Sequence, residues 1–353
     1  MMKFLTTLSL LLITNFVIAQ SMSESQLTKY LVQKEFSGAV LMHNGATESI
    51  TATAGYKDQL EKVEILTEDR FKIASITKLF TAVLIMQLVD EGKLQLEDNI
   101  EKHLPSLDIT NANKIQISHL LQHTSGLQNE SKFSYLKPIP PLGYVEQFAS
   151  KRALSKPGKS FNYNNVDYII LGLIIEEVTG ISYTTNLQDR ILDPLALGNT
   201  GLLKEKNDNS LTVQAFEKKK SGLKKEYSIH IENFWAAGSM YSTLKDLLTF
   251  SNALKTYQLL SESGKQVLFK SSAELGYAAL GCWTFNSPFI NGSPKVMERR
   301  GAILGSNSVI MTSLDGPETF IALSNTDQFN PDSFGNSEDM KEYLFKTLFN
   351  RKD

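Results

Sequence analysis

Apolar residues recur at strand-like spacing near both ends of the chain and at helix-like spacing between them. Residues 37–56 predict a β-hairpin, because two runs rich in apolar and β-branched residues flank the turn pair Asn44-Gly45. Residues 75–91 predict a helix that Gly92 ends. Towards the C-terminus, the pattern predicts strands over 277–285, 305–313 and 319–324 and an amphipathic helix over 337–349.

The middle of the chain has a mainly helical pattern. A short helix closes at residues 119–121 before a turn at Ser125-Gly126, and an apolar helix over 166–178 ends at Gly180. Strands at both ends with helices between them predict an α/β (α+β) fold, in which an antiparallel sheet is flanked by helices. We therefore expect a sheet domain from residues 20–95 and 236–353, and a mostly helical domain from residues 96–235.

The first 19 residues predict a secretory signal peptide. A basic start at Met1-Met2-Lys3 precedes an apolar run over 4–18, and Ala19 supplies a small residue for cleavage. The run is short and interrupted for a membrane anchor, so we expect an exported protein, periplasmic or secreted, with no stable membrane span after cleavage. Cys282 is the only cysteine, which excludes an intramolecular disulfide, and its apolar surroundings predict a small buried hydrophobe.

Overall charge gives no reason to expect a nucleic-acid partner. The 36 basic and 38 acidic side chains give a formal charge of -2, whereas nucleic-acid binding requires a concentrated basic face. One segment, 217–226, carries five lysines around Gly222. A solvated turn in an exposed hairpin explains this segment better than a surface for anionic partners.

A Ser-x-x-Lys pattern supplies the first candidate chemistry. It occurs four times, at Ser75, Ser134, Ser221 and Ser242, so the pattern alone decides nothing. Ser75 stands where a predicted helix begins, and side chains three residues apart share a helix face, so its Oγ can meet Lys78 Nζ. The free N–H groups of a first helical turn also favour a developing oxyanion. The structural alternative makes Ser75 a helix cap and Lys78 a surface lysine.

A serine needs a base before it can act as a nucleophile. No Gly-x-Ser-x-Gly segment occurs, which argues against the α/β-hydrolase arrangement. Lys78 is a candidate base if burial and nearby positive charge lower its pKa.

Two further patterns carry no predicted site. His119 and His123 have the spacing of a helical zinc pair, but Leu120 stands where that motif requires Glu, so structural packing is expected. Residues 157–160 match the end of a phosphate-binding loop, whose earlier glycine would fall at Ala153. We expect neither a metal nor a cofactor.

Five segments of the chain, beginning with Ser75-Ile76-Thr77-Lys78, together resemble the serine β-lactamases and penicillin-binding proteins, in the branch of class C β-lactamases and D-alanyl-D-alanine peptidases. The resemblance covers nearly the whole mature chain and rests on segments in the family's order. Besides the third motif considered next, they are Ser75-Ile76-Thr77-Lys78, Leu120–Leu127, Tyr163-Asn164-Asn165 with the helix behind it, and Tyr241–Leu247. Tyr-x-Asn occurs only at Tyr163. The alternative for this motif is a core aromatic followed by a helix cap.

The third family motif departs from its usual pattern. Where the family has Lys-Thr-Gly or His-x-Gly on a strand, this chain has Arg299-Arg300-Gly301-Ala302. Arg299 takes the cationic position, and Arg300 replaces a residue that is usually small. Arginine keeps a permanent charge and can grip a carboxylate, but it cannot relay protons near neutral pH.

The resemblance implies a β-lactamase/transpeptidase-like fold with the active site in the groove between the two domains. Ser75 would attack a carbonyl and form an acyl-enzyme, while Lys78 and Tyr163 share general-base and general-acid roles. Asn165 would bind the substrate amide, and the backbone N–H groups of Ser75 and Ala302 would form the oxyanion hole. Arg299 and Gly301 would line the substrate site.

The expected substrates are small molecules or peptidoglycan-derived peptides: D-amino-acid peptides, esters or β-lactams. An esterase or peptidase is favoured over a true β-lactamase, because no motif reports the deacylating water. A penicillin-binding-like sensor that binds without turnover is the alternative, and the double-arginine motif is the reason to keep it. No pattern indicates the oligomeric state.

Overall fold

A computed structural model describes residues 22–45, 49–204 and 211–349. The predicted signal peptide over residues 1–19 lies outside these residues. No described helix is long and apolar enough to cross a membrane.

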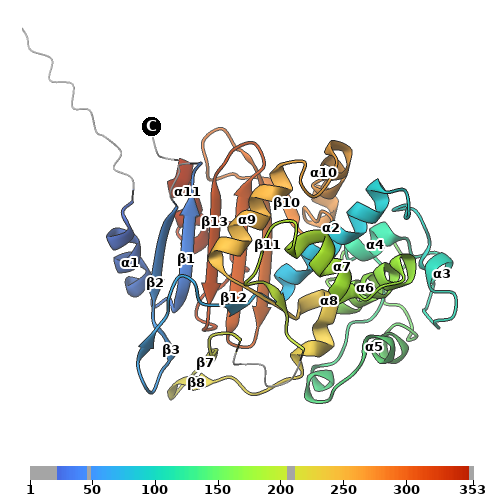
Figure 1. The fold of residues 1–353 in the computed structure, drawn as a ribbon, viewed down its shortest axis with the longest axis horizontal. Helices are drawn as coiled ribbons and strands as arrows, with labels where there is room; N and C mark the ends of the chain where they lie inside the picture. Colours follow the sequence, from blue (N-terminus) through green and yellow to red (C-terminus); the bar gives the residue numbers. More distant parts are fainter. Residues whose placement is uncertain (1–21, 46–48, 205–210, 350–353) are drawn as a thin grey trace, which may run out of the picture.

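A six-stranded antiparallel sheet forms the centre of the fold, and both ends of the chain contribute to it (Figure 1). Strands β1 and β13 pair in register from Gly38 opposite Ser324 to His43 opposite Thr319. This pairing confirms the predicted antiparallel sheet. In spatial order, the strands are β10 (Trp283–Asn286), β11 (Lys295–Ile303), β12 (Ser306–Ser313), β13 (Thr319–Ser324), β1 (Gly38–His43) and β2 (Ile50–Ala54).

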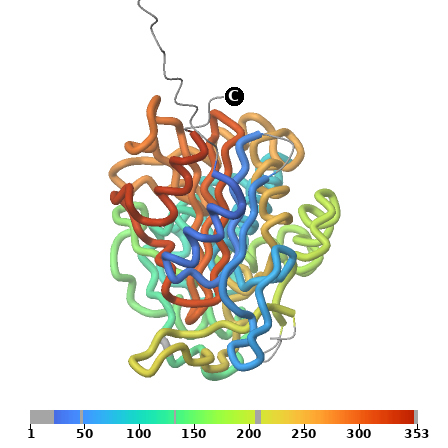
Figure 2. Tube along the Cα trace, turned by 90° about the vertical axis from the view of Figure 1, so that its left-hand side faces the viewer, coloured from blue at the N-terminus to red at the C-terminus, as the bar shows by residue number. Residues whose placement is uncertain are grey.

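One face of the sheet, called the reverse face below, is covered by the first and last helices of the described chain. Helices α1 (Glu24–Gln33) and α11 (Met340–Phe349) lie in front of the strands in Figure 2. Their apolar side chains, such as Leu31 and Phe345, are buried with residues of the sheet in one cluster. Buried charges also join α11 to β11, because Lys341 Nζ donates to Glu298 Oε1 at 3.0 Å and both side chains are fully buried.

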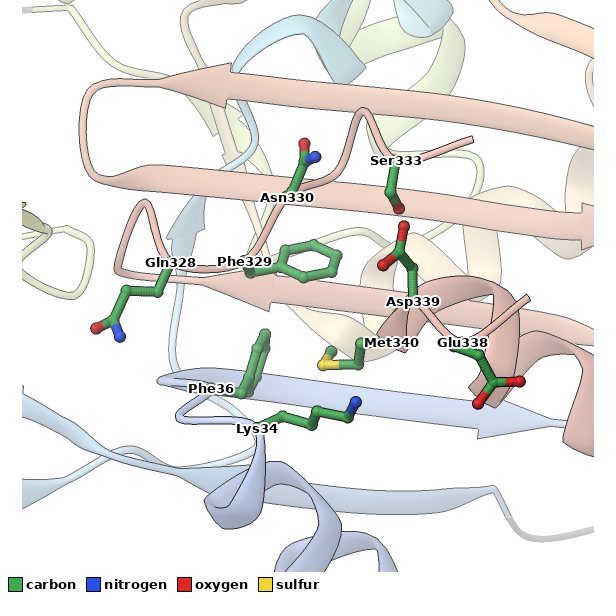
Figure 3. Close-up of a pocket in the computed structure, with 9 residues that line it drawn as sticks. All are labelled: Lys34, Phe36, Gln328, Phe329, Asn330, Ser333, Glu338, Asp339 and Met340. Carbon is green, nitrogen blue, oxygen red and sulfur yellow. The ribbon is translucent and has the colours of Figure 1, made fainter. Parts of the chain in front are cut away.

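A hollow of about 200 Å³ opens on this reverse side (Figure 3). The rings of Phe36 and Phe329 meet there edge to face, with centroids 5.6 Å apart. The lining residues are Lys34, Phe36, Gln328, Phe329, Asn330, Ser333, Glu338, Asp339 and Met340. The hollow contains none of the residues predicted to act in the site.

The other face of the sheet packs against helices that hold the larger apolar core. Helices α2 (Thr77–Asp90) and α6 (Asn165–Thr179) are apolar on nearly all sides, which is typical of helices buried inside a protein. Around them lie α3 (Ile100–His103), α4 (Ile117–Leu121), α5 (Pro141–Phe148), α7 (Tyr183–Leu187), α8 (Trp235–Gly238), α9 (Leu244–Lys255) and α10 (Glu262–Leu268). Because one core runs from the sheet into these helices, the domain boundaries at residues 95 and 236 stay a prediction.

Short strands complete the fold. The hairpin of β7 (Phe216–Lys219) and β8 (Gly222–Lys225) confirms the exposed hairpin predicted for the lysine-rich segment. The remaining strands are β3 (Tyr56–Asp58) with β4 (Val63–Glu64), and β5 (Phe71–Lys72), β9 (Met240–Ser242) and β6 (Gly201–Leu202) in a second sheet.

Three elements differ from the prediction. The strand expected over 277–285 begins only at Trp283, because Tyr277 and Gly281 have positive φ angles of 64° and 76° that break an extended chain. The helix expected over 337–349 begins at Met340. Strand β11 was not predicted from its own pattern, because charged residues stand where a buried strand normally carries apolar ones.

Candidate active site

Ser75 lies in a short 3₁₀ turn, η1 (Ala74–Ile76), that leads directly into α2. Ala74 has a φ of 45°, a left-handed conformation that costs a non-glycine residue about 1–3 kcal/mol. Thr77 fastens the turn, since its Oγ1 donates to Ala74 O at 2.7 Å and accepts from Met240 N–H at 3.2 Å. Ser75 is therefore held in a constrained turn at the start of α2.

Lys78 is completely buried one turn after Ser75. Its Nζ lies 3.2 Å from Ser75 Oγ, 2.6 Å from Asn165 Oδ1 and 2.7 Å from the carbonyl oxygen of Ala237 in α8. Burial lowers the pKa of Lys78, and the positive charge of Arg299 lowers it further. Burial and a nearby positive charge, which Lys78 requires to act as a base, are thus both present.

Tyr163 lies just before Asn164, the N-cap of α6, and completes a compact cluster around Ser75. Its Oη donates to Ser75 Oγ at 2.6 Å and accepts from Arg299 Nη2 at 3.1 Å. Burial by itself would raise the pKa of Tyr163, but the charges of Lys78 and Arg299 outweigh it and lower the pKa to about 8. Tyr163 is therefore a group that can exchange a proton at moderately alkaline pH.

The two asparagines after Tyr163 divide their roles. Asn164 caps α6, because its Oδ1 accepts from Val166 N–H at 2.8 Å. Asn165 is the first residue of the helix and turns its Oδ1 to Lys78, while its Nδ2 donates to Glu130 Oε1 at 2.7 Å. The predicted binding residue is thus free of the capping role, and Glu130 is a neighbour that no sequence motif indicated.

Arg299 and Arg300 point to opposite faces of β11, as consecutive strand residues do. Arg299 is buried beside the candidate nucleophile, with its Nε donating to Ser75 O at 2.7 Å. Arg300 points to the face of the sheet that α11 covers, where its guanidinium pairs with Glu298 and reaches Asp332 Oδ1 at 3.5 Å. Arg299 therefore holds the cationic position of the motif, and Arg300 does not crowd Ser75.

Gly301 lets β11 approach the turn that carries Ser75. A Cβ at this position would lie 2.1 Å from Ile73 O and 2.6 Å from Ser308 Oγ, so any larger residue would push the strand and the turn apart. The pairing of β10 with β11 ends at Glu298, so β10 does not pair with the part of β11 that holds Gly301 and the exposed Ala302. The oxyanion role of the Ala302 N–H stays a prediction.

A layer of buried polar side chains lies next to Tyr163. The ring of His123 is buried 4.5 Å from the ring of Tyr163, and its Nδ1 accepts from Asn164 N–H at 3.2 Å. Burial lowers the pKa of His123 well below its usual value and raises the pKa of Asp167, which accepts from Ser125 Oγ at 2.6 Å. Burial therefore disfavours the charged form of both groups, and His123 packs against Tyr163.

The other candidate groups lie apart from this cluster. Ser134 Oγ donates to Ser131 O, and Ser242 Oγ bonds to Thr200 Oγ1. Thr243, rather than Ser242, caps α9. Burial raises the pKa of Cys282 to about 12, consistent with an inert thiol. Among residues 22–45, 49–204 and 211–349, no three His, Cys, Asp or Glu side chains form a group that could hold a metal.

Known proteins with related sequences and folds include several hydrolases. The teichoic acid D-alanine hydrolase of Staphylococcus aureus is 28% identical over 237 residues, which make up 67% of this chain and 58% of that protein. The chain therefore spans less than two thirds of the curated relatives it matches.

Solved structures agree with this kinship. A D-stereospecific amidohydrolase from Streptomyces sp. superimposes with a TM-score of 0.76 and 26% identity, over 91% of this chain and 97% of that one. The D-amino acid amidase of Ochrobactrum anthropi SV3, complexed with D-phenylalanine, has a TM-score of 0.79 at 21% identity, over 92% and 96% of the two chains. This second likeness shows the fold alone.

A family model described as Beta-lactamase matches residues 23–345, nearly the whole of the chain that is described. The match includes all of the residues that gather around Ser75. The chain therefore belongs to the Beta-lactamase family, as its motifs predicted.

Proposed function

We propose that this protein hydrolyses esters or amides of D-amino acids through an acyl-enzyme on Ser75. One observation carries the proposal: Ser75 Oγ lies within hydrogen-bonding distance of both Lys78 Nζ and Tyr163 Oη, two groups whose pKa values are lowered. A nucleophile with an adjacent, tuned base is the arrangement that acyl transfer requires.

In the proposed acylation, neutral Lys78 takes the Ser75 proton as Oγ attacks the substrate carbonyl. The two N–H bonds of a neutral amine fit the two carbonyl-type acceptors, Asn165 Oδ1 and Ala237 O, and the lone pair is left for Ser75. The backbone N–H groups of Ser75 and Ala302 receive the developing oxyanion.

The remaining proton steps involve Tyr163. As the tetrahedral intermediate collapses, the Tyr163 Oη proton passes to the leaving oxygen or nitrogen, and the Lys78 ammonium returns a proton to Tyr163. Water then adds to the acyl carbonyl, gives up one proton to the same pair of groups, and Ser75 leaves as the free hydroxyl. Arg299 stabilises charge on Tyr163 during these transfers.

The substrate class is supported by the relatives and by the site. Two of them are named for D-alanine hydrolysis and D-stereospecific amide hydrolysis. Arg299 supplies a buried fixed charge that also suits the free carboxylate of a D-alanyl-D-alanine peptide. We place this activity outside the cytoplasm, in the periplasm or secreted, because the N-terminus has the pattern of a signal peptide.

A paired substrate screen tests the proposed function. Purified mature protein is assayed with D- and L-alanine p-nitrophenyl esters, D- and L-phenylalanine amides, a D-alanyl-D-alanine peptide and a chromogenic cephalosporin. We expect steady-state hydrolysis of the D-ester or D-amide, faster than that of its L partner, and a fluorophosphonate adduct located on Ser75 by mass spectrometry. Binding without turnover of any substrate would favour the sensor alternative, and an adduct on another residue would refute the mechanism.

Replacing Arg299 is expected to move the pH profile. Its charge lowers the pKa values of both Lys78 and Tyr163, so Arg299→Gln raises both. Because acylation needs neutral Lys78 and protonated Tyr163, activity is lost as the pH falls through the pKa of Lys78. The rising limb of kcat/KM should therefore move to higher pH, by on the order of one pH unit. Arg299→Lys keeps a positive charge and should leave the limb near that of the wild type; an unshifted limb in Arg299→Gln would contradict the assignment.

A further inference from the structure

We propose that Glu130 is a positioning residue that acts on Lys78 through the side chain of Asn165. The inference rests on the proposed function, because it assigns Glu130 a part in activating Ser75. Glu130 lies in the connection between α4 and α5, three residues after the family segment Leu120–Leu127 and outside it, and its side chain bonds to Asn165.

Glu130 and Lys78 hold opposite ends of the same amide. Asn165 Oδ1 accepts from Lys78 Nζ at 2.6 Å, and Asn165 Nδ2 donates to Glu130 Oε1 at 2.7 Å. The backbone of Asn165 is fixed as well, because its N–H donates to Asn129 Oδ1 at 2.9 Å. The amide is thus a rigid link between an acidic loop residue and the candidate base.

The identity of Glu130 decides which way this amide faces. An ionised carboxylate only accepts hydrogen bonds, so it can pair with Nδ2 of Asn165 but not with Oδ1. Tyr135 reinforces this orientation, since its Oη donates to the same Glu130 Oε1 at 2.8 Å. If the amide were reversed, Asn165 would present an N–H to Lys78 and compete for the lone pair that must take the Ser75 proton.

The charge of Glu130 also acts on Lys78. Glu130 opposes the lowering of the Lys78 pKa that burial and Arg299 produce. Its second carboxylate oxygen, Oε2, is buried and makes no hydrogen bond within the described residues, so that oxygen gains no partner to offset its charge. The other ionisable groups close to Lys78 are Tyr163 and Tyr168, whose rings lie 4.9 and 5.6 Å from Nζ, Arg299, and the buried His123 and Asp167.

These contacts give Glu130 two separable effects. By fixing the Asn165 amide, it keeps the lone pair of neutral Lys78 directed at Ser75. By its charge, it sets the pH at which Lys78 becomes neutral. A residue with only a structural role would affect neither the reactivity of Ser75 nor its pH dependence in a folded protein.

The test measures kcat/KM and the rate of fluorophosphonate labelling against pH for Glu130→Gln, Glu130→Asp and Tyr135→Phe. Glutamine nearly preserves shape, but it carries no charge and can bond to either end of the Asn165 amide. We expect Glu130→Gln to lower kcat/KM by about 10- to 100-fold, the range for losing a hydrogen bond to a charged group. Without the charge, the pKa of Lys78 falls, so the rising limb should move to lower pH, opposite to the shift for Arg299→Gln.

The matched variants separate positioning from stability. Glu130→Asp retains the charge and should restore the wild-type limb with partial activity. Tyr135→Phe leaves the bond between Glu130 and Asn165 and should keep the wild-type limb. A folded Glu130→Gln protein, verified by thermal unfolding, with wild-type rate and pH profile would overturn the inference. Failure of the wild type to be labelled at Ser75 would instead refute the proposed function, so the two failures are distinguishable.

Discussion

Ser75→Ala is expected to lower kcat/KM for every hydrolysed substrate by roughly 10⁴-fold or more, the scale seen when a hydrolase loses its nucleophile. The substitution removes only Oγ, which bonds to Tyr163 and Lys78. The backbone contact of Ser75 O with Arg299 remains, so substrate binding should be largely retained. The measurement is steady-state hydrolysis together with intact-protein mass spectrometry after fluorophosphonate treatment.

Ser221→Ala provides the matched control for this loss. Ser221 begins another Ser-x-x-Lys segment, but it is exposed in the turn between β7 and β8. We expect wild-type turnover and wild-type labelling from this variant. Full hydrolysis by Ser75→Ala would show that the nucleophile lies elsewhere.

Lys78→Met is expected to reduce kcat/KM by roughly a thousandfold, within the range for loss of a general base. Methionine approaches lysine in length and fits a fully buried site, but it offers neither a lone pair for the Ser75 proton nor an ammonium to recharge Tyr163. Without the Lys78 charge, the pKa of Tyr163 should also rise from about 8. With Lys78 gone, ionised Tyr163 is the remaining base beside Ser75, so residual activity should appear only at higher pH.

Two measurements make this second prediction decisive. The first is circular dichroism with thermal unfolding, which shows whether Lys78→Met is folded. The second compares it with Lys245→Met, in which an exposed lysine of the Ser242 segment is changed and activity should be unaffected. A folded Lys78→Met protein that hydrolyses substrate at the wild-type rate would exclude Lys78 as the base.

The spacing of apolar residues predicted those parts of the fold in which burial of apolar side chains dominates. The helices containing Lys78 and Asn165 are almost wholly apolar, so burial gives them clear patterns. The lysine-rich hairpin was predicted by its turn glycine. Strand β11 could not be recognised in this way, because Glu298, Arg299 and Arg300 are buried or half-buried charges that pair across space.

In the site, too, residues linked by local spacing could be predicted, and residues brought together only by the tertiary fold could not. Ser75 and Lys78 were selected because helical spacing alone brings them together, and the family resemblance added Tyr163, Asn165 and Arg299. Nothing in the local sequence marks Glu130 or the carbonyl of Ala237, since each contacts Lys78 or Asn165 only after distant segments fold together. A backbone acceptor such as Ala237 O has no residue-specific signature at all.

Helix α11 bears on the site although it lies on the opposite side of the sheet. The same strand carries Arg299 on one face and Glu298, the buried partner of Lys341, on the other. Removing one member of a buried ion pair costs up to about 3–5 kcal/mol, and without Lys341 the buried Glu298 carboxylate would keep only Arg300 as a charged partner in the part of the chain that the structure describes. Versions of this protein that end before Met340 would thus lose the Lys341 contact that supports the strand positioning Arg299, so truncations at the C-terminus should leave residues through Phe349 in place.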